Sequence, residues 1–182
     1  MLNSCVTARR ENASVVFSDF KVTPDPVEIP GNLTVSGAVV FKEAISGNVS
    51  LELAINRSMG FFDLTLPCIN HLGSCKYDDV CTILDQGNAS LGCAPQLKEN
   101  GFPCQCPFLN GTYDINHTIF VLPEVKGIWK QFAKGDYAIS LKLVDEDAGE
   151  ILGCQELTFS LDEPHPEGVT PKPCDWLCKL IG

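Results

Sequence analysis

The stretch Val49-Ser50-Leu51-Glu52-Leu53-Ala54-Ile55 alternates large aliphatic side chains with smaller or polar ones. A period of two puts the first set on one face of a β-strand and the second set on the other face. Such a strand buries its aliphatic face against a hydrophobic core and leaves its other face closer to solvent. The stretch therefore predicts a half-buried strand of an antiparallel sheet.

The same alternation recurs in four other parts of the chain. Their apolar members are Leu33, Val35, Val39 and Phe41; Phe62, Leu64 and Leu66; Tyr137, Ile139, Leu141 and Leu143; and Leu157, Phe159 and Leu161. Gly37 interrupts the first of these runs, at a position where we expect a β-bulge. Turn-forming residues separate the runs, at 24–26, 30–31, 46–48 and 145–149. Several short strands at this spacing predict an all-β domain, either an antiparallel sandwich or a barrel.

Ten cysteines indicate a disulfide framework rather than a metal site. They are Cys5, Cys68, Cys75, Cys81, Cys93, Cys104, Cys106, Cys154, Cys174 and Cys178. No two of them have the Cys-x2-Cys spacing of zinc ligands, and the chain has only three histidines. We therefore expect disulfides and no bound metal. Six of the cysteines fall in 68–107, a segment predicted to be stapled loop with a short helix around 78–84.

Seven asparagines begin an Asn-x-Ser/Thr triplet, which is more than chance places in a chain of this length. They are Asn12, Asn32, Asn48, Asn56, Asn88, Asn110 and Asn116. Such triplets accept N-linked glycans on exposed loops or strand ends. Together with the cysteines they predict a glycoprotein of the secretory route, either secreted or lysosomal.

The formal net charge of −10 excludes some partners. No basic stripe is present, so we do not expect nucleic acid as a partner. No apolar run reaches the length of a transmembrane helix, and no apolar signal segment follows Met1, which is typical of a mature or trimmed N-terminus. An anionic membrane would repel this chain at pH 7, and that repulsion would weaken in acid. The negative charge is equally explained by solubility alone.

The sequence contains few candidates for catalytic residues. A nucleophile must lie beside a base and a group that orients the base. His117 lies inside a glycosylation triplet, His165 lies in a Pro-rich segment, and His71 lies in a short loop between two cysteines. Asp78 and Asp79 are adjacent, so they point in different directions, and a helix N-terminus explains them better. We expect no catalytic residues and no cofactor.

Short motifs between residues 5 and 161 carry a family resemblance. They are Pro24-Asp25-Pro26, Ile29-Pro30-Gly31-Asn32-Leu33-Thr34, Leu66-Pro67-Cys68, Leu72-Gly73-Ser74-Cys75, Gly101-Phe102-Pro103-Cys104-Gln105-Cys106-Pro107-Phe108 and Leu152-Gly153-Cys154. With the order of the cysteines, these motifs resemble the ganglioside activator proteins, a group within the lipid-recognition (ML) domain family. The resemblance implies a cup-shaped, immunoglobulin-like β-sandwich whose two sheets enclose an apolar lipid cavity.

The same resemblance implies a disulfide pattern. The expected bridges are Cys5–Cys154, Cys68–Cys75, Cys81–Cys106 and Cys93–Cys104, and the two cysteines left over, Cys174 and Cys178, are expected to pair with each other. The mammalian activators carry tryptophans near the N-terminus and before Cys68, where this chain has Leu2 and the pair Phe61-Phe62. These differences bear on the choice of lipid more than on the fold.

Two apolar segments are candidates for the rim of the lipid cavity. Their members are Met59, Phe61 and Phe62, beside Gly60, and Ile128, Trp129 and Phe132, flanked by Lys126, Lys130 and Lys134. Large apolar groups beside lysines suit the surface of an anionic membrane. The aromatic residues could equally belong to the core, and the sequence does not decide between the two positions.

The chain is expected to divide into a lipid-binding domain over 1–161, a Pro-rich linker over 162–173 and a short disulfide-closed apolar tail over 174–182. The tail contains Trp176, Leu177, Leu180 and Ile181. It could close the cavity as a plug, touch a membrane or pack on the sandwich.

The resemblance implies a non-enzymatic protein that extracts a glycolipid or a phospholipid from a membrane and presents it to a lysosomal hydrolase. The implied partners are a glycosphingolipid or phospholipid, a β-hexosaminidase-type glycosidase and, transiently, a membrane. A secreted module that delivers lipid to a receptor, or senses it for one, is an alternative from another class. An interaction domain without a cavity is a third.

Overall fold

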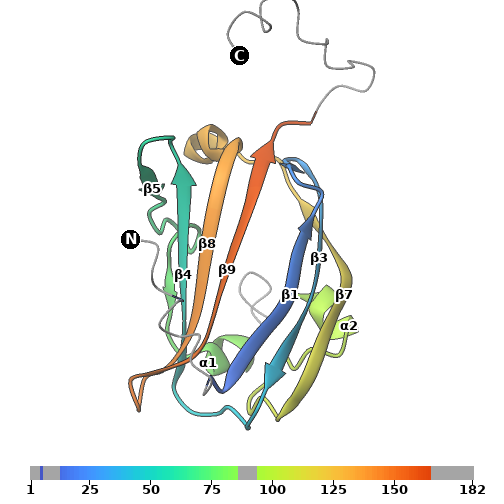
Figure 1. Cartoon of the computed structure of the whole chain (residues 1–182), viewed down its shortest axis with the longest axis vertical. Coiled ribbons are helices and arrows are strands. Elements are labelled where there is room, and N and C mark those ends of the chain that lie inside the picture. The colour runs from blue at the N-terminus through green and yellow to red at the C-terminus, as the bar shows by residue number, and fades with distance from the viewer. Residues whose placement is uncertain (1–4, 6–12, 86–93, 165–182) are drawn as a thin grey trace, which may run out of the picture.

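The structure is a computed structural model, and it describes Cys5, residues 13–85 and residues 94–164. Two β-sheets face each other (Figure 1). The smaller sheet has the order β1-β3-β7, formed by Val15–Thr23, Gly31–Phe41 and Gly111–Leu122. The larger sheet has the order β2-β9-β8-β4-β5, formed by Val27–Glu28, Glu150–Asp162, Gly135–Asp145, Val49–Ser58 and Asp63–Thr65, with β6 (Lys76–Tyr77) also paired to β4. The predicted all-β sandwich is confirmed; one strand pair, β2 with β9, is parallel.

The described residues also form three short helices. In Figure 1, α1 (Val80–Asp85) lies at the lower end of the sandwich, α2 (Pro95–Glu99) lies beside β7, and the 3-10 helix η1 (Gly127–Phe132) lies at the upper end. The helix expected around 78–84 is α1. Asp79 begins it, because its carboxylate accepts a hydrogen bond from the backbone N–H of Thr82 at 3.0 Å. Hydrogen bonds from the Thr82 hydroxyl and then from this N–H hold the pKa of Asp79 below its usual value.

The strands predicted in the larger sheet pair as their alternation suggests. Leu53 of β4 lies opposite Leu141 of β8, and Ile139 lies opposite Leu157 of β9. The run from Phe62 to Leu66 differs from expectation, because only three exposed residues of it form β5. This strand lies at the edge of the sheet, and Leu66 is buried beyond its end.

Strand β1 does not follow a strict period of two, because it contains one extra residue. Ser18 pairs with Ala38, whereas Lys21 pairs with Ser36, so two residues of β1 lie opposite Gly37 alone. After such a bulge, each side chain lies on the face of the sheet opposite to the one that a strict period of two predicts.

Strand β7 has a bulge of the same kind, opposite the residue that precedes Gly37 in β3. Val35 pairs with Thr118 and Gly37 pairs with Ile115, so residues 116–117 lie opposite a single residue of β3. Strand β7 is the outer strand of this sheet and, among the strands described, pairs only with β3.

Gly37 lies where both registers shift, which confirms the bulge expected there. Its φ is +155°, and a Cβ at this position would lie 2.9 Å from ring atoms of Phe20. Only glycine therefore allows the Phe20 ring to fold over the middle of β3.

The tightly packed core lies at the end of the sandwich covered by α1, which we call the closed end (Figure 1). Its seven buried residues are Val15, Val39, Phe41, Ile45, Val49, Phe108 and Ile115. The rings of Phe41 and Phe108 stack at 5.3 Å. The sheets approach each other closely at Gly153 of β9, where a Cβ would lie 2.6 Å from the carbonyl oxygen of Val15.

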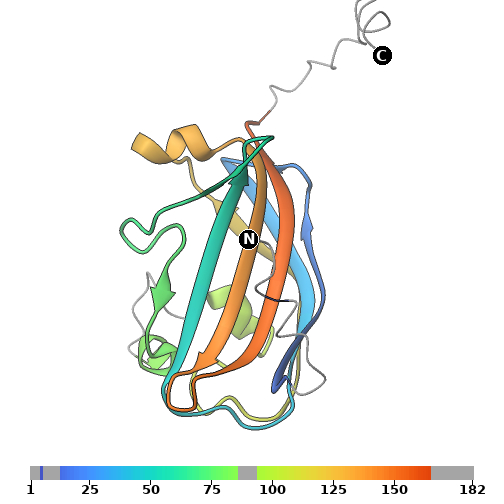
Figure 2. The same ribbon diagram turned by 60° about the vertical axis from the view of Figure 1, so that its left-hand side comes forward.

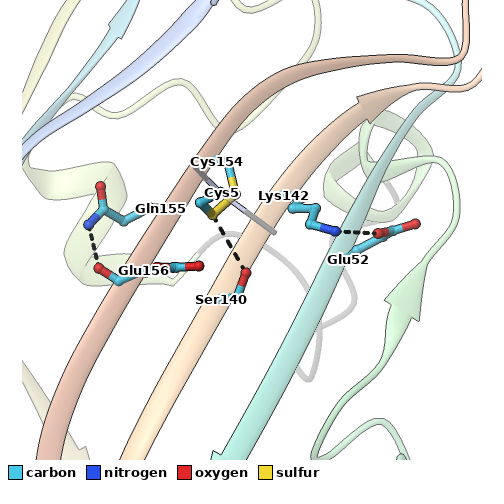
Figure 3. Close-up of a disulfide and its surroundings, with 7 residues drawn as sticks. All are labelled: Cys5, Glu52, Ser140, Lys142, Cys154, Gln155 and Glu156. Atoms are coloured by element: carbon cyan, nitrogen blue, oxygen red, sulfur yellow. Dashed lines mark hydrogen bonds and ion pairs between the residues drawn. A yellow bond between two sulfur atoms is a disulfide. The ribbon is translucent and has the colours of Figure 1, made fainter. Parts of the chain in front are cut away.

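Three of the expected disulfides are present in the described part of the chain: Cys5–Cys154, Cys68–Cys75 and Cys81–Cys106. Figure 3 shows the first of them beside β8, where the Ser140 hydroxyl lies 3.6 Å from the Cys5 sulfur. Cys104 is also disulfide-bonded, but its expected partner Cys93 lies outside the described residues. The expected Cys174–Cys178 pair lies outside them as well.

Four of the seven glycosylation triplets begin at exposed positions, namely Asn32, Asn48, Asn110 and Asn116. Asn56 is half-buried in β4, and its side-chain oxygen accepts a hydrogen bond from the Thr65 hydroxyl. Asn12 and Asn88 lie outside the described residues. No helix in the described ranges is long and apolar enough to cross a bilayer.

Candidate functional site: an apolar cavity at the open end

A cavity of about 450 Å³ lies at the end of the sandwich opposite to the core cluster, which we call the open end. Its volume is within the range of roughly 300–1,000 Å³ that is typical of small-molecule sites. The lining is largely apolar and consists of Ile29, Ile55, Leu66, Leu72, Gly73, Pro123, Glu124, Val125, Lys126, Trp129, Phe132, Ala133, Tyr137, Ile139, Phe159 and Leu161.

The floor of the cavity is the inner face of the larger sheet. Ile55, Ile139 and Phe159 come from the adjacent strands β4, β8 and β9, and all three are only half-buried although they line the interior. In the core cluster, by contrast, the exposed fraction of each side chain is 1–6%. Close-packed interiors leave few voids. Half-exposed inner side chains therefore mark a space that the described residues do not fill.

One wall is formed by η1, which connects β7 to β8 at the upper end of Figures 1 and 2. Trp129 and Phe132 point into the cavity from this helix, with their ring centres 6.0 Å apart.

Arg57 of β4 holds the end of η1 in place. Its guanidinium donates to the carbonyl oxygens of Gln131 at 3.1 Å and Lys134 at 2.6 Å, and lies 5.8 Å from the centre of the Phe132 ring. Tyr137 adds a hydrogen bond from its hydroxyl to the Phe132 carbonyl oxygen at 2.5 Å. Burial raises the pKa of Tyr137, so this hydroxyl keeps its proton. The last turn of η1 is therefore fixed to the floor of the cavity.

The adjoining wall is the loop that the Cys68–Cys75 disulfide closes. The Ser74 hydroxyl accepts the Ile55 N–H at 2.9 Å and so ties this loop to β4. Gly73 has φ +99°, and a Cβ there would lie 2.1 Å from the Pro67 carbonyl oxygen and 3.5 Å from the Trp129 ring. Glycine thus allows the loop to turn tightly beneath Trp129.

The structure brings only part of the predicted rim together. Trp129 and Phe132 line the cavity, whereas Ile128 on the same helix is exposed. Met59, Phe61 and Phe62 form the turn after β4, where the N–H of Met59 donates to the Phe62 carbonyl at 2.9 Å. All three are exposed, Phe61 fully, and none of them lines the cavity.

Charged groups stand at the mouth rather than inside. Lys126 and Glu124 are exposed where they border the cavity, and Lys130 is exposed beside it. Lys134 is not free, because it forms an ion pair with Asp162 at 2.9 Å. A hydrogen bond with that carboxylate raises the pKa of Lys134.

The sequence does not predict the wall formed by the loop that the Cys68–Cys75 disulfide closes. Leu72 and Gly73 belong to a short motif in a cysteine-rich loop, and such a loop has no periodic pattern that would assign them to a cavity. Ile55, Ile139 and Phe159 were recognised as apolar strand residues, but alternation alone does not distinguish a filled core from an open one. Among the residues that the structure describes, no three His, Cys, Asp or Glu side chains are placed to hold a metal ion.

Comparison with known proteins identifies the family. Residues 1–161 match the family model of the ML domain. The chain therefore belongs to the lipid-recognition (ML) domain family, as its motifs implied. Among its relatives, the ganglioside GM2 activator of Macaca fascicularis is 32% identical over 147 residues, covering 80% of this chain and 76% of that protein. The ganglioside GM2 activator of Mus musculus is 29% identical, covering 80% and 75%.

A solved structure was also matched. The Niemann-Pick type C2 protein from the Japanese carpenter ant aligns over 80% of this chain and 91% of its own, with 14% identity and a TM-score of 0.40.

Proposed function

We propose that this protein is a non-enzymatic lipid-binding and transfer protein. It extracts a ganglioside-like glycolipid or a phospholipid from a membrane, holds the apolar part in the cavity at the open end, and presents the head group to a lysosomal hydrolase. The observation that carries this proposal is the cavity of about 450 Å³, which has an apolar floor and two apolar walls.

The physical need for such a cavity follows from the cost of exposing a lipid. Each methylene moved from water to an apolar site contributes about 0.8 kcal/mol. A two-chain lipid with around thirty methylenes would therefore cost roughly 25 kcal/mol to hold bare in water. A carrier protein must therefore cover much of the apolar surface of the lipid chains with apolar side chains, as the membrane interior does.

The relatives favour presentation to a hydrolase over delivery to a receptor. Two of them are named as ganglioside activators, and a β-hexosaminidase-type glycosidase is the partner we propose for this chain. Disulfides and glycosylation triplets agree with a secreted or lysosomal location.

The exposed apolar turn supports a transient contact with the membrane. Met59, Phe61 and Phe62 project at the same end as the cavity, and Lys130 is exposed beside it. Apolar tips can enter the interface while lysines face anionic head groups. The protein would therefore meet the bilayer with its open end.

The test is titration of a pyrene-labelled ganglioside into the purified protein, with competition by unlabelled ganglioside. Leu72→Ser changes an exposed residue of the cavity wall and should weaken binding, by about tenfold for a lost contact of 1.4 kcal/mol. Val121→Ser is the matched control, because Val121 is also exposed but does not line the cavity. Equal losses for both variants, or no binding at all, would contradict the assigned site.

The hydrolase step has its own experiment. Release of the terminal sugar from ganglioside micelles by a β-hexosaminidase should depend on added protein, while a soluble chromogenic substrate should be cleaved without it. If lipid binds but the enzyme shows no dependence, the receptor alternative gains support.

A further inference from the structure

We propose that Asn56 carries an N-linked glycan whose first sugar lies in a polar depression on the outer face of the larger sheet. The depression is on the reverse side of the cavity floor. A sugar there would hold β4, β5, β8 and β9 together from outside, where their inner side chains are only half-buried. This inference does not depend on lipid binding and goes beyond the proposed function.

The first observation is the position of the depression, which has a volume of about 280 Å³. Asn56 of β4 pairs with Ala138 of β8, which pairs in turn with Thr158 of β9, and all three residues line the depression. Successive residues of a strand point to opposite faces of the sheet. Because Ile55 and Phe159 line the lipid cavity, their neighbours Asn56 and Thr158 point outward.

The second observation is the orientation of the Asn56 amide. Its oxygen accepts a hydrogen bond from the Thr65 hydroxyl at 2.7 Å, and Thr65 does not line the depression. An N-linked sugar is attached to the amide nitrogen, which lies on the other side of the amide group from this oxygen. Among the described residues this nitrogen has no hydrogen-bond partner. An attached sugar would therefore extend into the depression.

The third observation is the chemistry of the lining. Ser58, Asp63 and Thr158 are exposed, and their side-chain oxygens bond to no other described residue. Sugar hydroxyls can donate to these oxygens, and a carboxylate such as that of Asp63 is a strong acceptor. At about 30 Å³ for each water molecule, the depression holds roughly nine waters. This is enough space for a sugar ring.

The wall on the β9 side is already fixed without a sugar. The N–H of Ser160 donates to the Asp25 carboxylate at 2.9 Å, and the Ser160 hydroxyl donates to the Asp136 carboxylate at 2.7 Å. All three residues line the depression. A sugar would thus meet a preformed surface, which lowers the entropy that its binding costs.

The other acceptor asparagines of the described residues provide the comparison. Asn32, Asn48, Asn110 and Asn116 are exposed, and none of them lines this depression. Glycans at these positions would extend into solvent. Asn56 is half-buried in the middle of the sheet, where a glycan needs such a depression to be accommodated.

The first experiment measures access to the glycan in the full chain, secreted from cells that attach high-mannose glycans. Peptide mass spectrometry should find Asn56 occupied. Under native conditions, a peptide N-glycosidase should release the glycan of Asn56 more slowly than that of Asn48. If the sugar lies in the depression in about 90% of the molecules, the difference should be about tenfold. After denaturation the two rates should be equal.

The second experiment measures stability after an endoglycosidase has trimmed each glycan to a single N-acetylglucosamine. Asn56→Gln should lower the melting temperature by about 2–4 °C. This loss is counted beyond that which the same substitution causes in protein refolded without glycans, where only the bond to Thr65 is affected. Asn48→Gln is the matched control, because it removes an exposed glycan, and it should cause no additional loss.

An unoccupied Asn56, or equal rates of release from the native protein at Asn56 and Asn48, would overturn the proposal. An equal loss for Asn56→Gln with and without glycans would also overturn it. If Asn56→Gln is not secreted, the release rates decide, because they are measured on the wild type. None of these outcomes alters the proposed function, which rests on the cavity at the open end.

Discussion

The two ends of this sandwich use the same strands for different purposes. At the closed end, residues from both sheets meet directly, and the stacked rings of Phe41 and Phe108 fill the space between them. At the open end, the inner residues of β4, β8 and β9 face a cavity whose walls are η1 and a disulfide-closed loop. A strand can thus contribute to a packed core at one end and to the proposed binding site at the other.

This difference implies that the packing that stabilises the fold and the proposed binding site are separated along the strands. At the closed end the sheets pack closely and the seven core side chains are buried, so substitutions there should destabilise the protein. The open end leaves apolar surface unpacked, so substitutions there should change binding more than folding. Four predictions, in order of decreasing loss of stability, test the stability side of this division.

Loss of the Cys5–Cys154 bridge should have the largest effect. The bridge joins residues 149 apart in sequence, and in the chain-entropy model such a link contributes about 5 kcal/mol. This is a large share of a typical stability of about 5–15 kcal/mol. The double variant Cys5→Ser/Cys154→Ser, which leaves no free thiol from this pair, should be secreted poorly and melt at a much lower temperature. Peptide mapping that joined Cys5 to a different cysteine would refute the expectation.

Phe41→Ala at the closed end should cost roughly 3–5 kcal/mol, because it removes a buried ring and leaves a cavity. Phe61→Ala at the open end is the matched control, since the Phe61 ring is fully exposed. Its effect on stability should stay within about 0.5 kcal/mol. Urea denaturation measures the stability of both variants, and similar losses for the two would show that the two ends do not differ in packing.

Gly153→Ala should cost about 1–3 kcal/mol by overpacking. The new methyl group would lie 2.6 Å from the Val15 carbonyl oxygen, and backbone at that distance has to move. The sheets would then separate slightly at the closed end. Thermal unfolding measures the loss, and a melting temperature equal to that of the wild type would show that the sheets do not approach each other here as described.

Glu146→Gln should have the smallest effect and depend on pH. Glu146 pairs with Lys76 at 2.8 Å and also accepts a hydrogen bond from the buried Ser50 hydroxyl. The bond from Lys76, followed by that from Ser50, holds the pKa of Glu146 below its usual value. The carboxylate therefore stabilises the fold above the unfolded-state pKa, and this contribution is lost as the pH falls through the lower folded-state pKa.

The melting temperatures of wild type and Glu146→Gln should accordingly differ at pH 7 and pH 5 by the same small amount. The difference should shrink below about pH 4, where carboxyl groups become protonated. A difference in melting temperature that grew on acidification would contradict the lowered pKa of Glu146 in the folded state.

Much of the larger sheet could be predicted from the sequence, because its central strands keep a strict period of two. Val49 to Ile55 and Tyr137 to Leu143 follow that period and pair with each other in register. Strands β1 and β7 could not be predicted in this way. Each has a bulge opposite the middle of β3, and the inserted residue reverses the faces of the side chains that follow.

Of the residues that line the cavity, the sequence predicts only the aromatic residues of η1. Trp129 and Phe132 were candidates, and both line the cavity. Leu72 and Gly73 were not, because their place depends on a disulfide and on a tight turn beneath Trp129. Which end of the sandwich is filled also depends on long-range contacts, such as that of Phe41 with Phe108, that a local pattern does not contain.

The position of β7 at the edge of its sheet has a consequence for solubility. Unpaired edge strands offer N–H and C=O groups to a second molecule, and proteins protect such edges against aggregation. Asn110 immediately precedes β7 and Asn116 lies within it at the bulge, and both are exposed. Glycans on these two residues would stand along the edge and keep a second strand from adding to it. Protein made without glycans should therefore self-associate faster than the glycosylated form, which light scattering at equal concentration would measure.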